Sequence, residues 1–115
     1  MTFDDGIIGI YLLSDVQEVD GKKPIKKLTL VENFYFGYET LGINRYYTAL
    51  EANQQIECVV HIPDWHEIDA SMHVAIMENG NQYLIRMVQP THDEFQLRVT
   101  RLTLERIHEN YAVMP

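Results

Sequence analysis

The sequence predicts a mainly β protein, a small antiparallel β-barrel or sandwich of about six strands with one short α-helix. Runs rich in Val, Ile, Tyr and Phe alternate with polar residues at the two-residue period of a β-strand. Gly, Pro and Asn separate these runs, and strands do not alternate with helices as they would in a parallel βαβ fold. With 115 residues, the chain is expected to form one domain, residues 1–115, with an ordinary buried core.

The first predicted strand, residues 6–13, is followed by a long polar loop. The strand contains Gly9, which indicates a bulge or a close approach of another backbone. The loop, residues 14–24, is charged and carries Gly21 and Pro24, which are typical of irregular segments. Its length predicts an exposed excursion rather than a tight turn.

Residues 25–39 return to strand patterning, with apolar side chains at even positions such as Leu28 and Phe36. The polar residues Glu32 and Asn33 interrupt this pattern. A bend, a bulge or a turn between two shorter strands would each produce such an interruption, and the sequence leaves these alternatives open.

The one predicted helix covers residues 44–52. Asn44 can cap its N-terminus, and Tyr46 and Tyr47 belong to an apolar stripe on one side. Asn53 tolerates the left-handed conformation that ends many helices, so the helix is expected to be short.

Residues 55–62 form the next predicted strand, which buries the face that carries Cys58 and exposes the face that carries His61. A polar loop at residues 63–69 follows and contains the single tryptophan, Trp65. Because Cys58 is the only cysteine, no internal disulfide is possible, and we expect a buried, inert thiol.

Asn79 and Gly80 predict a two-residue type I′ hairpin turn, because both residues tolerate positive φ. Such a turn places Glu78 opposite Asn81 and therefore fixes the pairing of the flanking strands. The predicted core face carries Val74, Ile76, Tyr83 and Ile85, and the opposite face carries His73, Leu84 and Arg86. We expect the second face to be half-exposed or to bind a partner.

A further strand is predicted from Phe95 onward, with apolar residues at odd positions as far as Val99. The apolar positions become even at Leu102. This change of parity predicts a β-bulge near Thr100 and Arg101.

The net charge of −8 and the isoelectric point near 4.9 argue against tight binding of a phosphate backbone. The only basic cluster, formed by Lys22, Lys23, Lys26 and Lys27, is interpreted as a solvated loop and strand start. No apolar run approaches the ~20 residues of a membrane span. The opening MTFDDG lacks the basic residues of a secretion signal, so we expect a cytoplasmic protein without a membrane partner.

Four histidines, His61, His66, His73 and His92, lie within a short stretch among acidic residues. Their spacing matches no metal-binding motif, and they are interpreted as solvated surface residues. Nucleophile, phosphate-loop and dinucleotide motifs are also absent from the sequence, which therefore predicts neither an enzyme nor a bound cofactor. A metal-binding or enzymatic β domain is the alternative.

Aromatic residues crowd between positions 34 and 47, in a number that a small core cannot easily bury on one side. Exposed tyrosines beside an arginine are typical of protein interfaces, whereas packing of the helix on the sheet is the alternative interpretation. The candidate interface residues are Arg45, Tyr46, Tyr47, Trp65, His73, Leu84 and Arg86.

Four short elements recur in order along the chain, namely Arg45 to Tyr47, His61 to Pro63, Gly80 to Ile85 and Leu102 to Arg106. Together with the run YFGYETLGINRYYTALEANQQIECVVHIP, they resemble small head closure (head-tail joining) proteins of siphophages and prophages of Gram-positive bacteria. The resemblance spans most of the chain. His61 departs from it, because an arginine is expected at that position.

The resemblance implies a non-enzymatic virion protein with a small β-barrel fold. Such proteins form a ring below the portal and adaptor, close the filled head and offer a docking surface to the tail. The implied partners are other copies of the chain, the portal or adaptor protein, and a tail or tail-terminator protein. DNA would pass an acidic lumen without specific binding. The implied location is the host cytoplasm during assembly and then the neck of the virion. A tail terminator or tail-completion protein is the alternative, because these share small β-rich folds.

Overall fold

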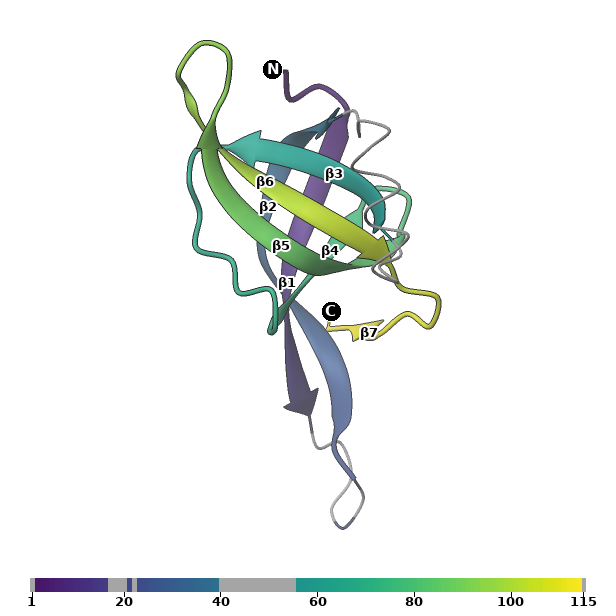
Figure 1. The fold of residues 1–115 in the computed structure, drawn as a ribbon. Coiled ribbons are helices and arrows are strands. Elements are labelled where there is room, and N and C mark those ends of the chain that lie inside the picture. Colours follow the sequence, from purple (N-terminus) through teal and green to yellow (C-terminus); the bar gives the residue numbers. More distant parts are fainter. Residues whose placement is uncertain (1, 17–20, 22, 40–55, 115) are drawn as a thin grey trace.

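The computed structural model describes residues 2–16, 21, 23–39 and 56–114. These residues form seven strands and no helix, so none of them belongs to a helix that could cross a membrane. The strands are β1 (Gly6–Val16), β2 (Ile25–Glu39), β3 (Ile56–Pro63), β4 (His73–Met77), β5 (Gln82–His92), β6 (Arg98–Arg106) and β7 (Ala112–Val113) (Figure 1). The prediction of a mainly β protein is confirmed, with one very short strand more than expected. The predicted helix, residues 44–52, lies outside the described residues.

All seven strands belong to one sheet, in the order β1-β4-β5-β6-β3-β2-β7. The pairs are antiparallel, except that β7 runs parallel to β2. In addition, β1 pairs directly with β2, so the pairings of the six longer strands return to the strand from which they start. Each of these six strands contributes to one buried interior.

The interior contains a cluster of buried apolar residues to which each of the six strands contributes. Alternate residues of each strand point into it, as the two-residue period of a strand requires. The cluster consists of Ile8, Ile10, Phe36, Val60, Ile62, Ala75, Met77, Tyr83, Ile85, Leu102 and Leu104. Burying one such large aliphatic or aromatic side chain contributes about 1.5–3 kcal/mol relative to leaving it in water.

The hairpin of β1 and β2 extends beyond the other strands. Of the residues of β1, only residues 8–12 pair with β4, whereas the pairing of β1 with β2 continues to Val16 and Ile25. Figure 1 shows this end of the hairpin projecting away from the body, with β7 beside its base. We call residues 13–16 and 23–28 the arm. The Cα radius of gyration, 15.4 Å, exceeds the about 13 Å of a compact chain of this length, as expected for a projecting element.

The first strand is longer than predicted, because its last residues find partners in β2. Asp15 faces Lys26 and Val16 faces Ile25 in the antiparallel register, so strand pairing extends the hairpin into the predicted loop. The second strand starts at Ile25, as predicted.

A bulge explains the polar interruption at Glu32 and Asn33. Ile10 faces Glu32 but Tyr11 faces Leu30, which leaves Val31 as the extra residue of β2. Of the three alternatives left open by the sequence, the bulge is therefore the observed one, and β2 continues through it as one strand.

Gly9 lies next to this bulge and allows a close approach, although of side chains rather than of a backbone. A Cβ atom at this position would lie 2.6 Å from a ring carbon of Tyr11 and 2.9 Å from Oδ1 of Asn33. The absence of a side chain thus makes room for these two groups.

The register of the β4–β5 hairpin differs by one residue from the prediction. Ala75 faces Tyr83 and Ile76 faces Gln82, because the turn contains three residues, 78–80, instead of two. Gly80 has a φ of 85°, and its N–H donates to the carbonyl oxygen of Met77 at 2.9 Å. This is the geometry of a three-residue hairpin with a left-handed third residue.

Asn79 was predicted to have positive φ, and this prediction is wrong. Its side-chain Oδ1 instead accepts a hydrogen bond from the N–H of Asn81 at 3.0 Å, a local contact that stabilises the turn. The shift of one residue exchanges the two faces of β4. Ala75 and Met77 therefore enter the central core cluster, whereas Val74 is buried as predicted but outside that cluster and Ile76 is only half-buried.

The predicted β-bulge near Thr100 and Arg101 is also wrong. β6 pairs with β3 and β5 without a register shift at these residues. β6 starts at Arg98, after Phe95 and Leu97. The odd positions of these two residues therefore do not indicate which face of β6 is buried.

We predict that Gly80→Val destabilises the protein by about 1–2 kcal/mol, because a β-branched residue is strained at positive φ. A Cβ at Gly80 would have no atom within 4 Å, so the loss reports backbone strain rather than a clash. Chemical denaturation followed by circular dichroism measures it. Gly80→Asn is the matched control and should lose less, because Asn tolerates this conformation; equal stability of all three proteins would contradict the turn geometry.

Candidate functional site

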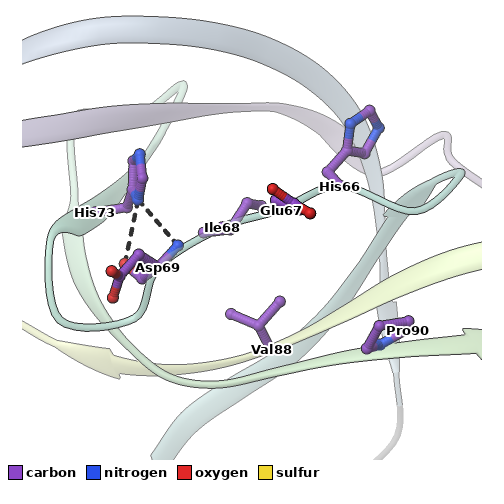
Figure 2. Close-up of a pocket in the computed structure, with 7 residues that line it drawn as sticks. All are labelled: His66, Glu67, Ile68, Asp69, His73, Val88 and Pro90. Atoms are coloured by element: carbon purple, nitrogen blue, oxygen red, sulfur yellow. Dashed lines mark hydrogen bonds between the residues drawn. The ribbon is translucent and has the colours of Figure 1, made fainter.

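A groove lies between β5 and the connection from β3 to β4. Its volume is about 450 Å³. Figure 2 shows the connection on one side and Val88 and Pro90 of β5 on the other. The lining residues are His66, Glu67, Ile68, Asp69, His73, Val88 and Pro90. Ile68 and Val88 also pack against the core, so the floor of the groove is continuous with the interior of the fold.

Thr100 holds the start of this connection. Its hydroxyl donates to the carbonyl oxygen of Asp64 at 2.8 Å and accepts a hydrogen bond from the N–H of His66 at 3.1 Å. Because Thr100 is fully buried, these bonds satisfy a polar group that would otherwise be costly inside the protein. The ring of His66 also packs against Phe34 of β2, with ring centroids 4.5 Å apart. The connection is thus tied both to β6 and to β2.

Asp69 and His73 hold the end of the connection, as Figure 2 shows. The Asp69 N–H donates to Nδ1 of His73 at 3.0 Å. Nδ1 also lies 3.1 Å from the carbonyl oxygen of Asp69, so the ring contacts both the N–H and the C=O of that residue. The Asp69 carboxylate accepts hydrogen bonds from the hydroxyl and the N–H of Ser71, at 2.6 and 2.9 Å. The bond from the hydroxyl is the main cause that lowers the pKa of Asp69.

The groove combines an apolar floor with an acidic rim. Ile68, Val88 and Pro90 supply the floor, and the exposed carboxylates of Glu67 and Asp69 lie on the connection above it. This composition suits a ligand that carries both an apolar group and positive charge.

The four histidines of the predicted cluster lie in different environments. His66 and His73 stand at the two ends of the groove (Figure 2), and His92 packs its ring against Trp65 at 5.2 Å. Within the described part of the chain, no group of three or more His, Cys, Asp or Glu residues is placed to hold a metal ion.

His61 was predicted to be solvated, and this prediction is wrong. Only 3% of the residue is exposed, because the N-terminal segment covers it. Its Nε2 lies 2.7 Å from the carbonyl oxygen of Thr2, and the ring of Phe3 contacts it edge-on at 5.2 Å. Gly37 makes room for this arrangement, since a Cβ there would lie 2.1 Å from the same oxygen. Both faces of β3 are therefore covered, a fact that the alternation in the sequence does not reveal.

Trp65 ties the connection to the neighbouring hairpin. Its Nε1–H donates to the carbonyl oxygen of Thr91 at 2.9 Å, and the guanidinium carbon of Arg98 lies 5.3 Å from its ring centre. Arg98 also forms an ion pair with Asp64 at 3.0 Å. Trp65 nevertheless remains 43% exposed, so it both holds the connection in place and forms part of the surface.

The loop between β5 and β6 exposes two large apolar side chains that the sequence interpretation assigned to a strand. Phe95 is 71% and Leu97 is 62% exposed. The carboxylate of Asp93 accepts hydrogen bonds from the N–H groups of both, at 2.9 and 3.0 Å, and Gln96 adopts a positive φ of 63°. An aspartate that bonds backbone amides two and four residues ahead is a turn signal, which could have identified this loop.

Arg86 and Leu84 lie on the outer side of β5. The pairing with β6 shifts between Ile85 and Met87, which places Arg86 at a bulge. There it forms an ion pair with Glu105 of β6, so this predicted interface residue already has a partner within the chain. Leu84 is half-buried beside the same strand.

A third ion pair joins strands that are not neighbours. Arg101 of β6 reaches across β3 to Glu39 at the end of β2, with bonds of 2.6 and 2.9 Å from Nε and Nη2. The hydrogen bond with Glu39 raises the pKa of Arg101. The guanidinium binds the carboxylate through two parallel bonds, which fixes the relative position of the two strands.

The structure distributes the predicted interface residues rather than gathering them. Trp65 lies beside the β5–β6 loop, His73 lines the groove, and Leu84 and Arg86 lie on the outer side of β5. Arg45, Tyr46 and Tyr47 lie outside the described residues.

No protein-family model matches the chain, and no curated protein shows significant similarity to it.

We predict that Trp65→Phe lowers the free energy of unfolding by about 0.5–1.5 kcal/mol, because the hydrogen bond to Thr91 is lost. Urea denaturation followed by circular dichroism measures the change. Tyr35→Phe, at an aromatic residue that is 65% exposed, is the control and should stay within about 0.5 kcal/mol of the parent protein. If both variants behave alike, Trp65 does not tie the connection to the hairpin.

We predict that Ser71→Ala raises the pKa of Asp69 towards its ordinary value, because the hydroxyl bond is its main depressing cause. A depressed pKa means that the ionised carboxylate favours the folded state above the ordinary Asp pKa of about 3.9. This contribution is lost as the pH falls through the lower, folded-state value. An NMR titration of the Asp69 carboxyl carbon measures the shift, and Ser71→Thr, which keeps the hydroxyl, should retain the low pKa.

Proposed function

We propose that this chain is a structural, non-enzymatic subunit of the neck of a tailed phage. In this proposal, copies of it form a ring that closes the DNA-filled head below the portal and adaptor and receives the tail. The observation that carries the proposal is the spread of exposed, large apolar side chains over separate parts of the described surface. A ring subunit needs such surfaces, because it contacts lateral neighbours as well as partners above and below.

Three groups of residues illustrate this spread. The β5–β6 loop exposes Phe95 and Leu97 at one end of the molecule, and the arm exposes Ile25 at the other (Figure 1). Between them, β2 exposes Leu30, Val31 and Tyr35 along its length. Two of these groups lie on hydrogen-bonded strands and the third on a loop held by Asp93, so all are presented in defined positions.

We infer further that the six longer strands form a small barrel rather than a sandwich. The support is the pairing of β1 with both β4 and β2, which links the two ends of the strand order. A closed barrel leaves few strand edges for unwanted pairing, which suits a subunit that waits for its assembly partner.

The acidic composition fits the proposed role beside DNA. With a net charge of −8, a ring of such subunits would repel the phosphate backbone and let DNA pass without specific binding. The proposed partners are other copies of the chain, the portal or adaptor protein, and a tail or tail-terminator protein. In this proposal the protein is in the host cytoplasm before assembly and in the virion neck afterwards.

Reconstitution on a portal–adaptor complex tests the proposal. Negative-stain images should show an additional ring when the protein is added, and no ring at saturating concentration would refute the proposal. Binding to isolated tail tubes instead would favour a tail terminator. The oligomeric state of the isolated protein does not decide the matter, because such subunits can remain monomeric until a template presents their binding sites.

We predict that Arg86→Glu impairs this assembly but leaves the protein folded. The variant brings two carboxylates together at Glu105, and because the Arg86 side chain is 47% exposed, the loss of stability should stay below about 1 kcal/mol. The double variant Arg86→Glu with Glu105→Arg restores the internal pair. If the double variant assembles normally, Arg86 acts through the internal pair; if assembly stays impaired, as we expect, Arg86 contacts a partner.

A further inference from the structure

The basic residues of the chain are divided between the arm and the body. All four lysines, Lys22, Lys23, Lys26 and Lys27, fall within six consecutive positions of the sequence. Three of the body's arginines are engaged in ion pairs, Arg86 with Glu105, Arg98 with Asp64 and Arg101 with Glu39. Since the chain has 17 acidic and 9 basic residues, the body is strongly acidic, whereas the arm has three lysines, Lys23, Lys26 and Lys27, against one acid, Asp15.

The arm also presents an apolar side chain among these charges. Ile25 is 49% exposed, and Lys23, Pro24 and Lys26 around it are exposed as well. The pairing of Ile25 with Val16 holds this segment in an extended, two-stranded form. The arm therefore offers an isoleucine flanked by ammonium groups on a preformed scaffold, which limits the entropy lost on binding.

The groove beside the β3–β4 connection has the complementary composition. Its floor of Ile68, Val88 and Pro90 can accept an apolar side chain, and Glu67 and Asp69 can pair with flanking cations. Its volume of about 450 Å³ greatly exceeds that of one isoleucine side chain, so neighbouring residues can enter with it. The groove is bounded by the hydrogen bonds of Thr100 and His73 at its two ends and is thus also preformed.

We propose that the arm of one copy docks into the groove of a second copy of this chain. Within one chain the two do not meet, because the arm projects away from the body and none of its residues lines the groove (Figure 1). The contact joins two different surfaces, so repetition of it generates a closed ring or an open filament. This inference names the lateral contact of the proposed ring. Its assignment to a ring rests on the proposed function.

A second copy is favoured over a nucleic acid as the occupant of this contact. A phosphate backbone that approached the lysines would also approach an acidic body, which repels it. The groove, in turn, requires a cationic and apolar ligand, and the arm is the described part of this chain that combines both properties. One such contact is small and is expected to be weak, but a ring repeats it in every subunit, which strengthens the assembly.

Paramagnetic relaxation enhancement with the full-length protein detects such a weak contact. A nitroxide is attached at Asp15→Cys, an exposed position on the other strand of the arm, in a chain that carries Cys58→Ser, and this chain is mixed with an isotope-labelled chain without nitroxide. We expect at least twofold broadening of the amide signals of residues 67–69 and 88–91 in the labelled chain. Broadening that is absent, or is spread evenly over the surface, overturns the proposal.

Charge reversal provides the specificity control. Glu67→Lys with Asp69→Lys in the labelled chain should abolish the broadening, and Lys26→Glu in the nitroxide chain should restore part of it. Asp4→Lys, an exposed reversal outside the groove, should leave the effect unchanged. If the broadening persists in the groove variant, Glu67→Lys with Asp69→Lys, the arm binds elsewhere and the proposal is overturned.

The same variants separate this inference from the proposed function. If a ring forms on the portal–adaptor complex and is unaffected by the groove variant, the function stands and the lateral contact is wrong. If the relaxation experiment succeeds but no ring forms, the contact between copies stands and the neck function is wrong.

Discussion

The structure depends on one constraint, namely that β1 must pair with two strands at once. Its residues 8–12 bond to β4 on one edge, while the whole strand bonds to β2 on the other. This double pairing links β2, which lies near one end of the strand order, back to β1 at the other end. Gly9 lies within the shared stretch, where a side chain would collide with Tyr11 and Asn33. The bulge at Val31 allows β2 to bend around the same stretch.

The longer connections depend on a small number of buried or half-buried polar contacts. Thr100 orients the start of the β3–β4 connection, and Arg101 binds Glu39 across an intervening strand. His61 bonds the N-terminal segment from inside the fold. Two of these contacts join a strand to an irregular segment, and the third joins β6 to the end of β2. These polar contacts therefore decide where the grooves and surfaces of the molecule lie, while the apolar core decides the order of the strands.

The strands themselves could be predicted from the sequence, because alternation and turn residues are local signals. The faces of β4 could not, since they depend on whether the turn at Asn79 and Gly80 contains two or three residues. A two-residue turn and a three-residue turn would each place Gly80 at positive φ, so the sequence does not distinguish between them. The burial of His61 was likewise hidden, because it depends on a segment about sixty residues away that folds over it. Long-range covering of this kind leaves no periodic signal in the strand that is covered.

Of the candidate interface, the sequence indicated Trp65, His73 and Arg86 but not how they are used. Each proves to be bonded within the chain, to Thr91, Asp69 and Glu105 respectively. The exposed Phe95 and Leu97 were missed because their odd spacing imitates a buried strand face. The N–H groups of both residues donate to the Asp93 carboxylate, so Asp93 was the local turn signal that distinguishes their loop from a strand.

The short strand β7 has a practical consequence for the handling of this protein. The N–H of Met114 donates to the carbonyl oxygen of Leu28 at 2.8 Å, and Ala112 and Val113 run parallel to the base of the arm. Any peptide fused after this point, such as an affinity tag or a fluorescent protein, would emerge next to the arm and could shield it from binding partners. The opposite end of the chain, near Thr2, lies at the far side of the body (Figure 1). Purification handles and reporters are therefore better placed there, with a linker long enough to leave the contact between Thr2 and His61 undisturbed.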